Sequence, residues 1–154
     1  MAKQKVNVLA PDFELNDING ENSKISLSDY RNKKNVLIVF NRGFMWPFCR
    51  KHMTQLRNEK ETLVKFDIEV LIIGPEKSES FRKYWEKESL PFIGLPDPKH
   101  LVANLYGQQI KIFKLGRMPA QILIDKKGIL LYSFYGNSMS DIPSIDEVIN
   151  VLSN

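Results

Sequence analysis

The chain has 154 residues, of which 43% are hydrophobic and 26% charged, and this composition predicts a single globular domain over residues 1–154. Its net charge of +4 comes from lysines and arginines interleaved with acids, without the basic stripe of a nucleic-acid-binding protein. The longest apolar run, 36–40, is too short to span a bilayer and no secretory signal opens the sequence, so we expect a cytoplasmic protein with no membrane partner.

The first half of the chain predicts strands that alternate with helices. Residues 12–18 alternate apolar and polar side chains, as an edge strand does, and residues 28–30 begin a short helical turn. The unbroken apolar run 35–41 predicts a strand that is buried on both faces, and residues 68–74 predict a second buried strand. Between these two strands, residues 47–65 have the apolar spacing of a helix.

The second half continues this pattern and ends with a hairpin and a helix. In chain order, we expect a charged helix at 78–88, a short strand or loop at 90–98, a helix at 99–106, two antiparallel strands at 119–125 and 129–135, and an amphipathic helix at 144–152. Strand–helix–strand units predict an α/β fold, with a central mixed β-sheet flanked by helices on both faces.

The only cysteine, Cys49, lies in the first turn of the helix that Pro47 begins, just after a buried strand. Functional crevices of open α/β sheets form at the carboxyl ends of strands, and the unpaired N–H groups of a helix start stabilise an anion. Arg42 and Arg50 add positive charge nearby. This position predicts a reactive thiol with a lowered pKa; the alternative is a small buried apolar residue.

The two histidines give no further chemical signal. His52 lies one turn beyond Cys49, where a base is conceivable, but a packing or surface role is the favoured interpretation. His100 is expected at the surface. Two histidines and one cysteine, scattered along the chain, lack the spacing of metal ligands, so we predict no metal and no other cofactor.

Three segments together resemble the peroxiredoxins of the alkyl hydroperoxide reductase/thiol-specific antioxidant (AhpC/TSA) family. They are APDFELNDINGENSKISLSDYRNKKNVLIVFNRG, the cysteine-bearing helix and PAQILIDKKGILLYSFYG. The resemblance runs from Ala10 to about Leu152 and implies a thioredoxin-like fold. A branch of the family has the signature Arg-Gly-x-x-x-Pro-(Phe/Tyr)-Cys-Arg, which is present here as residues 42–50. The resemblance implies that Cys49 and Arg42 are catalytic, with Trp46, Pro47 and Arg50 in support.

Three positions depart from the usual peroxiredoxin pattern. Trp46 stands where thioredoxins carry a nucleophilic cysteine and typical peroxiredoxins a threonine that orients the peroxide; an indole donates a hydrogen bond but accepts none. Arg42 occupies the place of the proline that begins the usual motif. Pro119 replaces the family's arginine, which is the thioredoxin-type pattern. We therefore expect a cis Met118–Pro119 bond facing the sulfur, with Arg117 returning a guanidinium to the site.

The resemblance implies a thiol peroxidase that acts through one cysteine. Its substrate is hydrogen peroxide or an organic hydroperoxide, and an external thiol, from a thioredoxin-like protein or a small molecule, reduces the sulfenic acid that forms. By analogy, a homodimer is compatible with this family. Two alternatives stay open: a thiol–disulfide oxidoreductase, which the Pro119 pattern favours and the missing second cysteine opposes, and a redox-inactive thioredoxin-fold binding module, which Trp46 suggests.

Overall fold

A five-stranded mixed sheet forms the centre of the computed structural model, which describes residues 5–19, 23–44, 46–108, 110–111, 116–138 and 142–153. The strand order is β5-β4-β3-β8-β9. Strand β3 pairs in parallel with β4 and antiparallel with β8. The bounds are β3 (Asn35–Phe40), β4 (Ile68–Gly74), β5 (Ile93–Pro96), β8 (Ala120–Ile124) and β9 (Leu130–Tyr135). The predicted central mixed sheet is therefore confirmed.

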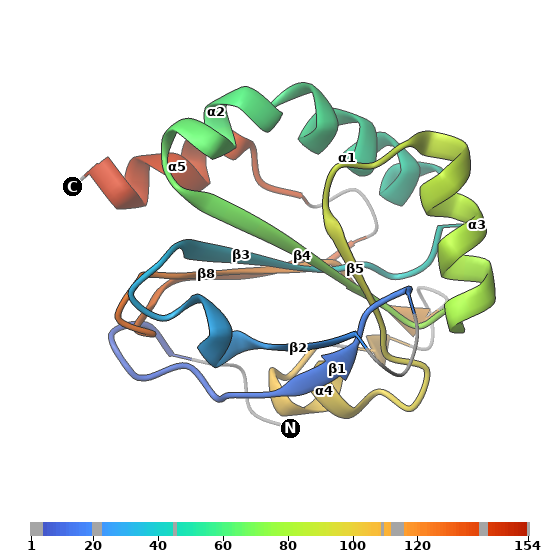
Figure 1. The fold of residues 1–154 in the computed structure, drawn as a ribbon, viewed down its shortest axis with the longest axis horizontal. Helices are drawn as coiled ribbons and strands as arrows, with labels where there is room; N and C mark the ends of the chain where they lie inside the picture. Colours follow the sequence, from blue (N-terminus) through green and yellow to red (C-terminus); the bar gives the residue numbers. More distant parts are fainter. Residues whose placement is uncertain are drawn as a thin grey trace.

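Different elements cover the two faces of this sheet (Figure 1). Four helices lie on one face: α1 (Pro47–Asn58), α2 (Lys60–Lys65), α3 (Ser78–Glu88) and α5 (Ile145–Ser153). The other face is covered by the short helix α4 (Leu101–Leu105), the 3-10 turn η1 (Leu27–Tyr30) and the hairpin of β1 (Glu14–Asn16) and β2 (Lys24–Ser26). Helices thus flank both faces, as predicted, but one face carries a single short helix.

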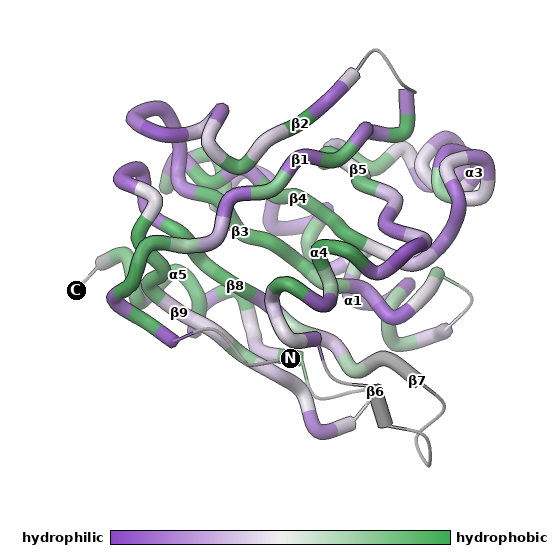
Figure 2. The backbone as a smooth tube through the Cα atoms, turned by 90° about the horizontal axis from the view of Figure 1, so that it is seen from below, coloured by the Kyte–Doolittle hydropathy of each residue, from purple (hydrophilic) through white to green (hydrophobic). Residues whose placement is uncertain are grey.

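The alternation of side chains along β3 builds two separate cores. Leu37 and Val39 face the four helices, whereas Val36, Ile38 and Phe40 face α4 and the N-terminal segment. Every residue of β3 is at least nine-tenths buried, which explains its unbroken apolar run. In Figure 2, hydrophobic colouring follows β3, β4 and β8 through the middle of the fold, while α3 at the edge is largely hydrophilic.

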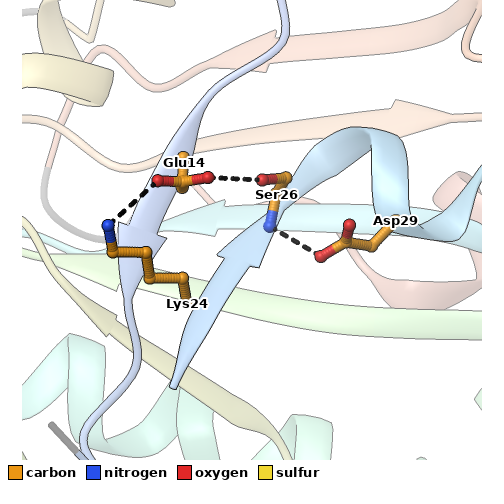
Figure 3. Close-up of polar contacts among 4 residues, drawn as sticks. All are labelled: Glu14, Lys24, Ser26 and Asp29. Carbon is orange, nitrogen blue, oxygen red and sulfur yellow. Dashed lines mark hydrogen bonds and ion pairs between the residues drawn. The ribbon is translucent and has the colours of Figure 1, made fainter. Parts of the chain in front are cut away.

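Of the hairpin formed by β1 and β2, the sequence predicts only β1. Glu14 contacts Lys24 Nζ at 3.6 Å and accepts a hydrogen bond from Ser26 Oγ at 3.3 Å, while Asp29 Oδ2 accepts one from Ser26 N–H at 2.9 Å (Figure 3). These contacts are exposed and add little stability. Strand β2 is too short for its sequence to show an alternating pattern. The same holds for β6 (Ile110–Lys111) and β7 (Gly116–Arg117), which pair with each other in a separate antiparallel hairpin.

The predicted helix over 47–65 is divided into α1 and α2 at Glu59. Its N–H group is shared between the carbonyls of Gln55 and Leu56, which tightens the chain there into a 3-10 turn. After the break, Leu63 of α2 lies in the core, where it is 1% exposed. Within the described ranges, no helix combines the length and the apolarity needed to cross a bilayer.

A buried polar contact joins α1 to the sheet. His52 Nε2 lies 3.0 Å from Nε2 of Gln121 on β8, and both residues are buried. Burial lowers the pKa of His52 to about 4, so the ring is neutral at neutral pH. This is the packing role that the sequence favoured for His52. The contact fixes the rotation of α1 over the sheet, and with it the position of Cys49 one turn earlier.

We expect acid to destabilise the protein through His52. Between pH 6.5 and about 4 the unfolded chain binds a proton that the folded chain excludes, so the stability conferred by the neutral ring is lost as the pH falls. The full effect is about 3 kcal/mol. Urea unfolding at several pH values, compared between the native chain and His52→Gln, should show a shallower pH dependence in the variant; parallel curves would contradict this.

We also expect Gly94→Ala to destabilise the fold. A Cβ atom at Gly94 would lie 2.8 Å from Phe81 Cε1 and 3.1 Å from Trp85 Cε2, so the alanine overpacks the core beside β5. The expected loss is about 1–3 kcal/mol in the free energy of unfolding. Phe81→Leu in the same chain makes room for the methyl group, so the double variant should lose less than the sum of the single losses. Additive losses would show that the ring is not the obstacle.

Candidate active site

The candidate site lies where the parallel strands β3 and β4 end side by side. Phe40 pairs with Ile73 at this edge, and Asn41 N–H then donates to Ile73 O at 2.8 Å. The chain next turns at Gly43, whose φ of 140° favours glycine. Trp46 is the N-cap of α1 and Pro47 its first residue, as predicted. A tight turn therefore carries the chain from β3 into the helix that holds Cys49.

Side chains from three elements hold this turn. Asn41 Oδ1 accepts a hydrogen bond from Gly43 N–H at 2.5 Å. Glu76, which follows the end of β4, accepts one from Phe44 N–H through Oε2 at 2.7 Å. Gln108 Nε2 donates to Asn41 O at 3.4 Å and to the carbonyl before Pro119 at 2.9 Å. The backbone around residues 41–44 is therefore fixed by side chains from the segments that follow β3, β4 and α4.

An aromatic cluster fixes the side chain of Phe44. Its ring stacks on Tyr84 with centroids 4.3 Å apart, and meets Phe81 and Trp85 edge-on at 4.7 and 5.4 Å. Beside it lies a groove of about 440 Å³ lined by Phe44, Glu76, Ser80, Lys83, Tyr84 and Lys87. Phe44 thus forms a rigid boundary between the core and the surface near Glu76.

Cys49 is buried, with 4% of its surface exposed. Burial raises the pKa of its thiol, and the Glu76 carboxylate adds to this effect. Backbone hydrogen bonding from residues 42 and 43 and the charge of Arg42 oppose the rise without cancelling it. The expectation of a lowered thiol pKa is therefore wrong for this conformation. The thiolate loses more stabilisation by leaving water than it gains from the cation and the N–H groups.

Arg42 is the cation beside the sulfur. It is 4% exposed, and its guanidinium carbon lies 4.1 Å from the centre of the Trp46 ring. Burial lowers the pKa of Arg42, and the nearby Cys49 acts in the opposite direction. The indole face thus stabilises a cation that has left bulk water. Trp46 acts here as a platform for Arg42, a role that its replacement of threonine did not suggest.

The other arginines of the sequence prediction are placed differently. Arg50 is exposed, and its charge acts on Tyr84. It is not among the groups that shift the pKa of Cys49. The backbone of Arg117 pairs with Ile110 in the β6–β7 hairpin, and its side chain lies outside the described part of the structure. Of the predicted arginines that the structure describes, Arg42 alone meets the sulfur.

The expected cis bond before Pro119 is absent, since every peptide bond among the described residues is trans. The register places Pro119 one step beyond the Phe40–Ala120 pair, beside the end of β3. Its carbonyl accepts a hydrogen bond from Gly136 N–H at 2.8 Å, as an extended strand requires. A trans bond satisfies this pairing, and X–Pro bonds favour trans by about 0.5–1 kcal/mol.

Glu76 is the residue of this site that sequence reasoning missed. It follows the carboxyl end of β4, and the same rule that singled out Cys49 after β3 applies to it. Together, the described residues bring to one place a buried thiol, a cation, two backbone donors and a carboxylate. This set suits attack by a thiolate on a small molecule in which negative charge develops.

Comparison with known proteins identifies the family. The AhpC/TSA family matches residues 6–133. The chain is 32% identical to peroxiredoxin Bcp of Bacillus subtilis over 131 residues, which cover 79% of each protein. It is 38% identical to a putative peroxiredoxin bcp of Haemophilus influenzae over 98 residues, 64% of this chain and 61% of that protein, so this match spans less than two thirds of that relative.

A solved structure agrees with the fold. The crystal structure of peroxidoxin BcpB from Mycobacterium tuberculosis superimposes with a TM-score of 0.83 over 97% of this chain and 96% of the other, at 20% identity. The thioredoxin-like fold implied by the sequence is thus confirmed. The chain belongs to the AhpC/TSA family and is a Bcp-like peroxiredoxin of the thioredoxin-like superfamily, a group of peroxide-reducing oxidoreductases.

Proposed function

We propose that this protein reduces hydroperoxides through Cys49 alone and depends on an external thiol for its own reduction. The observation that supports this most is the electrostatic surroundings of the sulfur: the charge of the buried Arg42 and backbone hydrogen bonding from residues 42 and 43, at the end of β3, both favour the thiolate. A small buried apolar cysteine needs neither a cation nor backbone donors. The same groups stabilise negative charge on an oxygen that reacts with the sulfur.

The reaction begins when the Cys49 thiol loses its proton to solvent. The thiolate attacks one oxygen of the hydroperoxide, so that an S–O bond forms while the O–O bond breaks. Sulfur is oxidised to sulfenic acid, and the departing oxygen leaves as an alkoxide or hydroxide that takes a proton from water. Arg42 stabilises the charge on that oxygen. Trp46, which lies against the guanidinium, holds Arg42 in place for this step.

The sulfenic acid requires a thiol from another molecule. The sequence has one cysteine, so no disulfide can form within the chain. An external thiol attacks the sulfenic sulfur, releases water and leaves a mixed disulfide, which a second thiol then reduces. The single cysteine and the trans bond before Pro119 both weigh against a thiol–disulfide oxidoreductase.

One observation favours the redox-inactive alternative. Cys49 is 4% exposed and its thiol pKa is raised, and both features slow the reactions of a thiol with electrophiles. Peroxide and an alkylating reagent distinguish the two functions, since a peroxidase site accelerates the peroxide reaction far beyond that of a free thiol, whereas burial slows both. A rate with hydrogen peroxide at or below that of free cysteine would favour a binding module.

The oxidised form of Cys49 provides the first test. We expect stoichiometric hydrogen peroxide followed by a 1,3-dicarbonyl reagent to add one reagent to the chain, on Cys49, as measured by intact and peptide mass spectrometry. The Cys49→Ser variant should gain nothing. Native protein that stays unmodified while free cysteine is oxidised would contradict the peroxidase function.

Removal of the cation should slow the reaction. Arg42→Gln withdraws the charge that lowers the thiol pKa and stabilises the departing oxygen, so we expect the second-order rate with hydrogen peroxide to fall about 100-fold at pH 7. Lys51→Gln removes an exposed positive charge from the same helix and should leave the rate within about twofold. Equal rates in the native chain and Arg42→Gln would exclude the proposed role.

In the native chain, the rate should also rise with pH to above 8.5, because burial raises the thiol pKa above its ordinary value of about 8.5. Stopped-flow measurements from pH 6 to 10 test this. A rate that is already constant at pH 7 would show that the thiolate forms in a different, more solvated conformation.

A further inference from the structure

We propose that Glu76 orients the hydroperoxide at Cys49 by accepting a hydrogen bond from its O–H group, an inference that rests on the proposed peroxidase function. The two oxygens of this carboxylate are placed differently. Oε2 accepts the Phe44 N–H bond at 2.7 Å. Oε1 is buried and has no hydrogen-bond partner within the described part of the chain. A buried acceptor without a partner is uncommon, and it suits a group that binds only when substrate arrives.

The backbone makes room for this carboxylate on two sides. A Cβ atom at Gly43 would lie 3.3 Å from Glu76 Oε2, and one at Gly74 would lie 3.2 Å from Oε1. Both contacts are tight, so larger residues at either position would displace the carboxylate. Glycines at the end of β4 and in the turn after β3 thus allow Glu76 to lie between these two segments, where its charge reaches Cys49.

The neighbouring groups are almost all donors. Arg42 and the N–H group of residue 42 donate, the N–H group of Gly43 is shared between Asn41 and Cys49, and an indole such as that of Trp46 has no acceptor. The Asn41 side-chain oxygen is already bonded to Gly43 N–H. A hydroperoxide needs one acceptor for its own O–H besides donors for its oxygens. Oε1 of Glu76 is an acceptor without a partner in the described part of the chain, on a carboxylate whose charge acts on Cys49, and it fits this need.

In this arrangement the hydrogen stays on the oxygen that the sulfur attacks. The thiolate forms the S–O bond, the O–O bond breaks, and the O–H group held by Glu76 becomes the O–H group of the sulfenic acid. Glu76 is not protonated in the step and transfers no proton. The departing oxygen leaves toward Arg42 and takes its proton from water. The carboxylate therefore acts by aligning the O–O bond with the sulfur.

Glu76 also has an opposing effect, and this makes the inference testable. Its negative charge disfavours the thiolate. If charge were its only influence, neutralising Glu76 would speed every reaction of Cys49 at pH 7. If it orients the hydroperoxide, the same change slows the peroxide reaction and still speeds attack on a reagent without an O–H group. The two roles predict changes of opposite sign.

The test uses Glu76→Gln and two electrophiles. The amide retains an acceptor for Phe44 N–H and replaces the other oxygen with an NH₂ donor. We expect the rate with hydrogen peroxide to fall about 10- to 100-fold, the loss typical of a hydrogen bond to a charged group, while alkylation by iodoacetamide becomes faster. Glu79→Gln is the matched control, because its exposed side chain bears the same charge near the start of α3 and pairs with Lys83; neither rate should change in it.

The outcome is read from the ratio of the peroxide rate to the alkylation rate. A ratio in Glu76→Gln equal to that of the native chain overturns the inference, while a native chain that reacts with peroxide still supports the proposed function. A native chain with no peroxide reaction overturns both. If Glu76→Gln does not fold, the ratio is measured in Glu76→Asp, which keeps the charge and withdraws the acceptor; a lower ratio supports the orienting role, and an unchanged ratio overturns it.

Discussion

The hydrogen bond from Phe44 N–H to Glu76 ties together the segments that follow two parallel strands, and the geometry of the site depends on it. Parallel strands end at the same edge of a sheet, but the loops that leave them are free to diverge. Here the carboxylate of Glu76, in the loop after β4, accepts a hydrogen bond from the loop after β3 and holds the two loops together. The chain can then turn at Gly43 and begin α1 with Cys49 next to the strand ends.

A second constraint is the competition between burial and charge at the sulfur. The apolar packing that fixes α1 also removes Cys49 from water, which favours the neutral thiol. Arg42 and the backbone donors favour the thiolate, and Arg42 in turn is buried against Trp46. The site thus holds its charges in a dry environment, where each interaction with a reacting oxygen is stronger than it would be in water.

The fold was largely predictable because long apolar runs and helical spacing mark its central elements. The runs at 35–41 and 68–74 became β3 and β4 almost residue for residue, and the helix start at Pro47 was correct. Strands of two or three residues, such as β2 and β6, carry no periodic signal and were missed. The break at Glu59 has no glycine or proline to mark it in the sequence.

The site was predictable only in part, because sequence proximity does not give solvation or orientation. Arg50 is next to Cys49 in the sequence and Arg42 is seven residues before it. In the fold, however, Arg50 is exposed, and it is the charge of Arg42 that acts on the sulfur. The sign of the thiol pKa shift depends on how deeply Cys49 itself is buried within an otherwise exposed first turn of α1, which no motif records. Glu76 is distant in sequence and reaches the site only because β3 and β4 are neighbours.

Trp46 at the N-cap of α1 affects both the position of Arg42 and the start of the helix that holds Cys49. Serine, threonine, aspartate or asparagine at this position would satisfy a helix N–H group with its own side chain. Among the described residues, Trp46 provides no such bond, so the first turn of α1 lacks a side-chain acceptor of its own. Because Pro47 has no N–H group, the next donors belong to residues at and beside Cys49. The residue that supports Arg42 therefore also leaves the first N–H groups of α1 without a side-chain cap, and the backbone donors that act on the sulfur come from residues 42 and 43 instead.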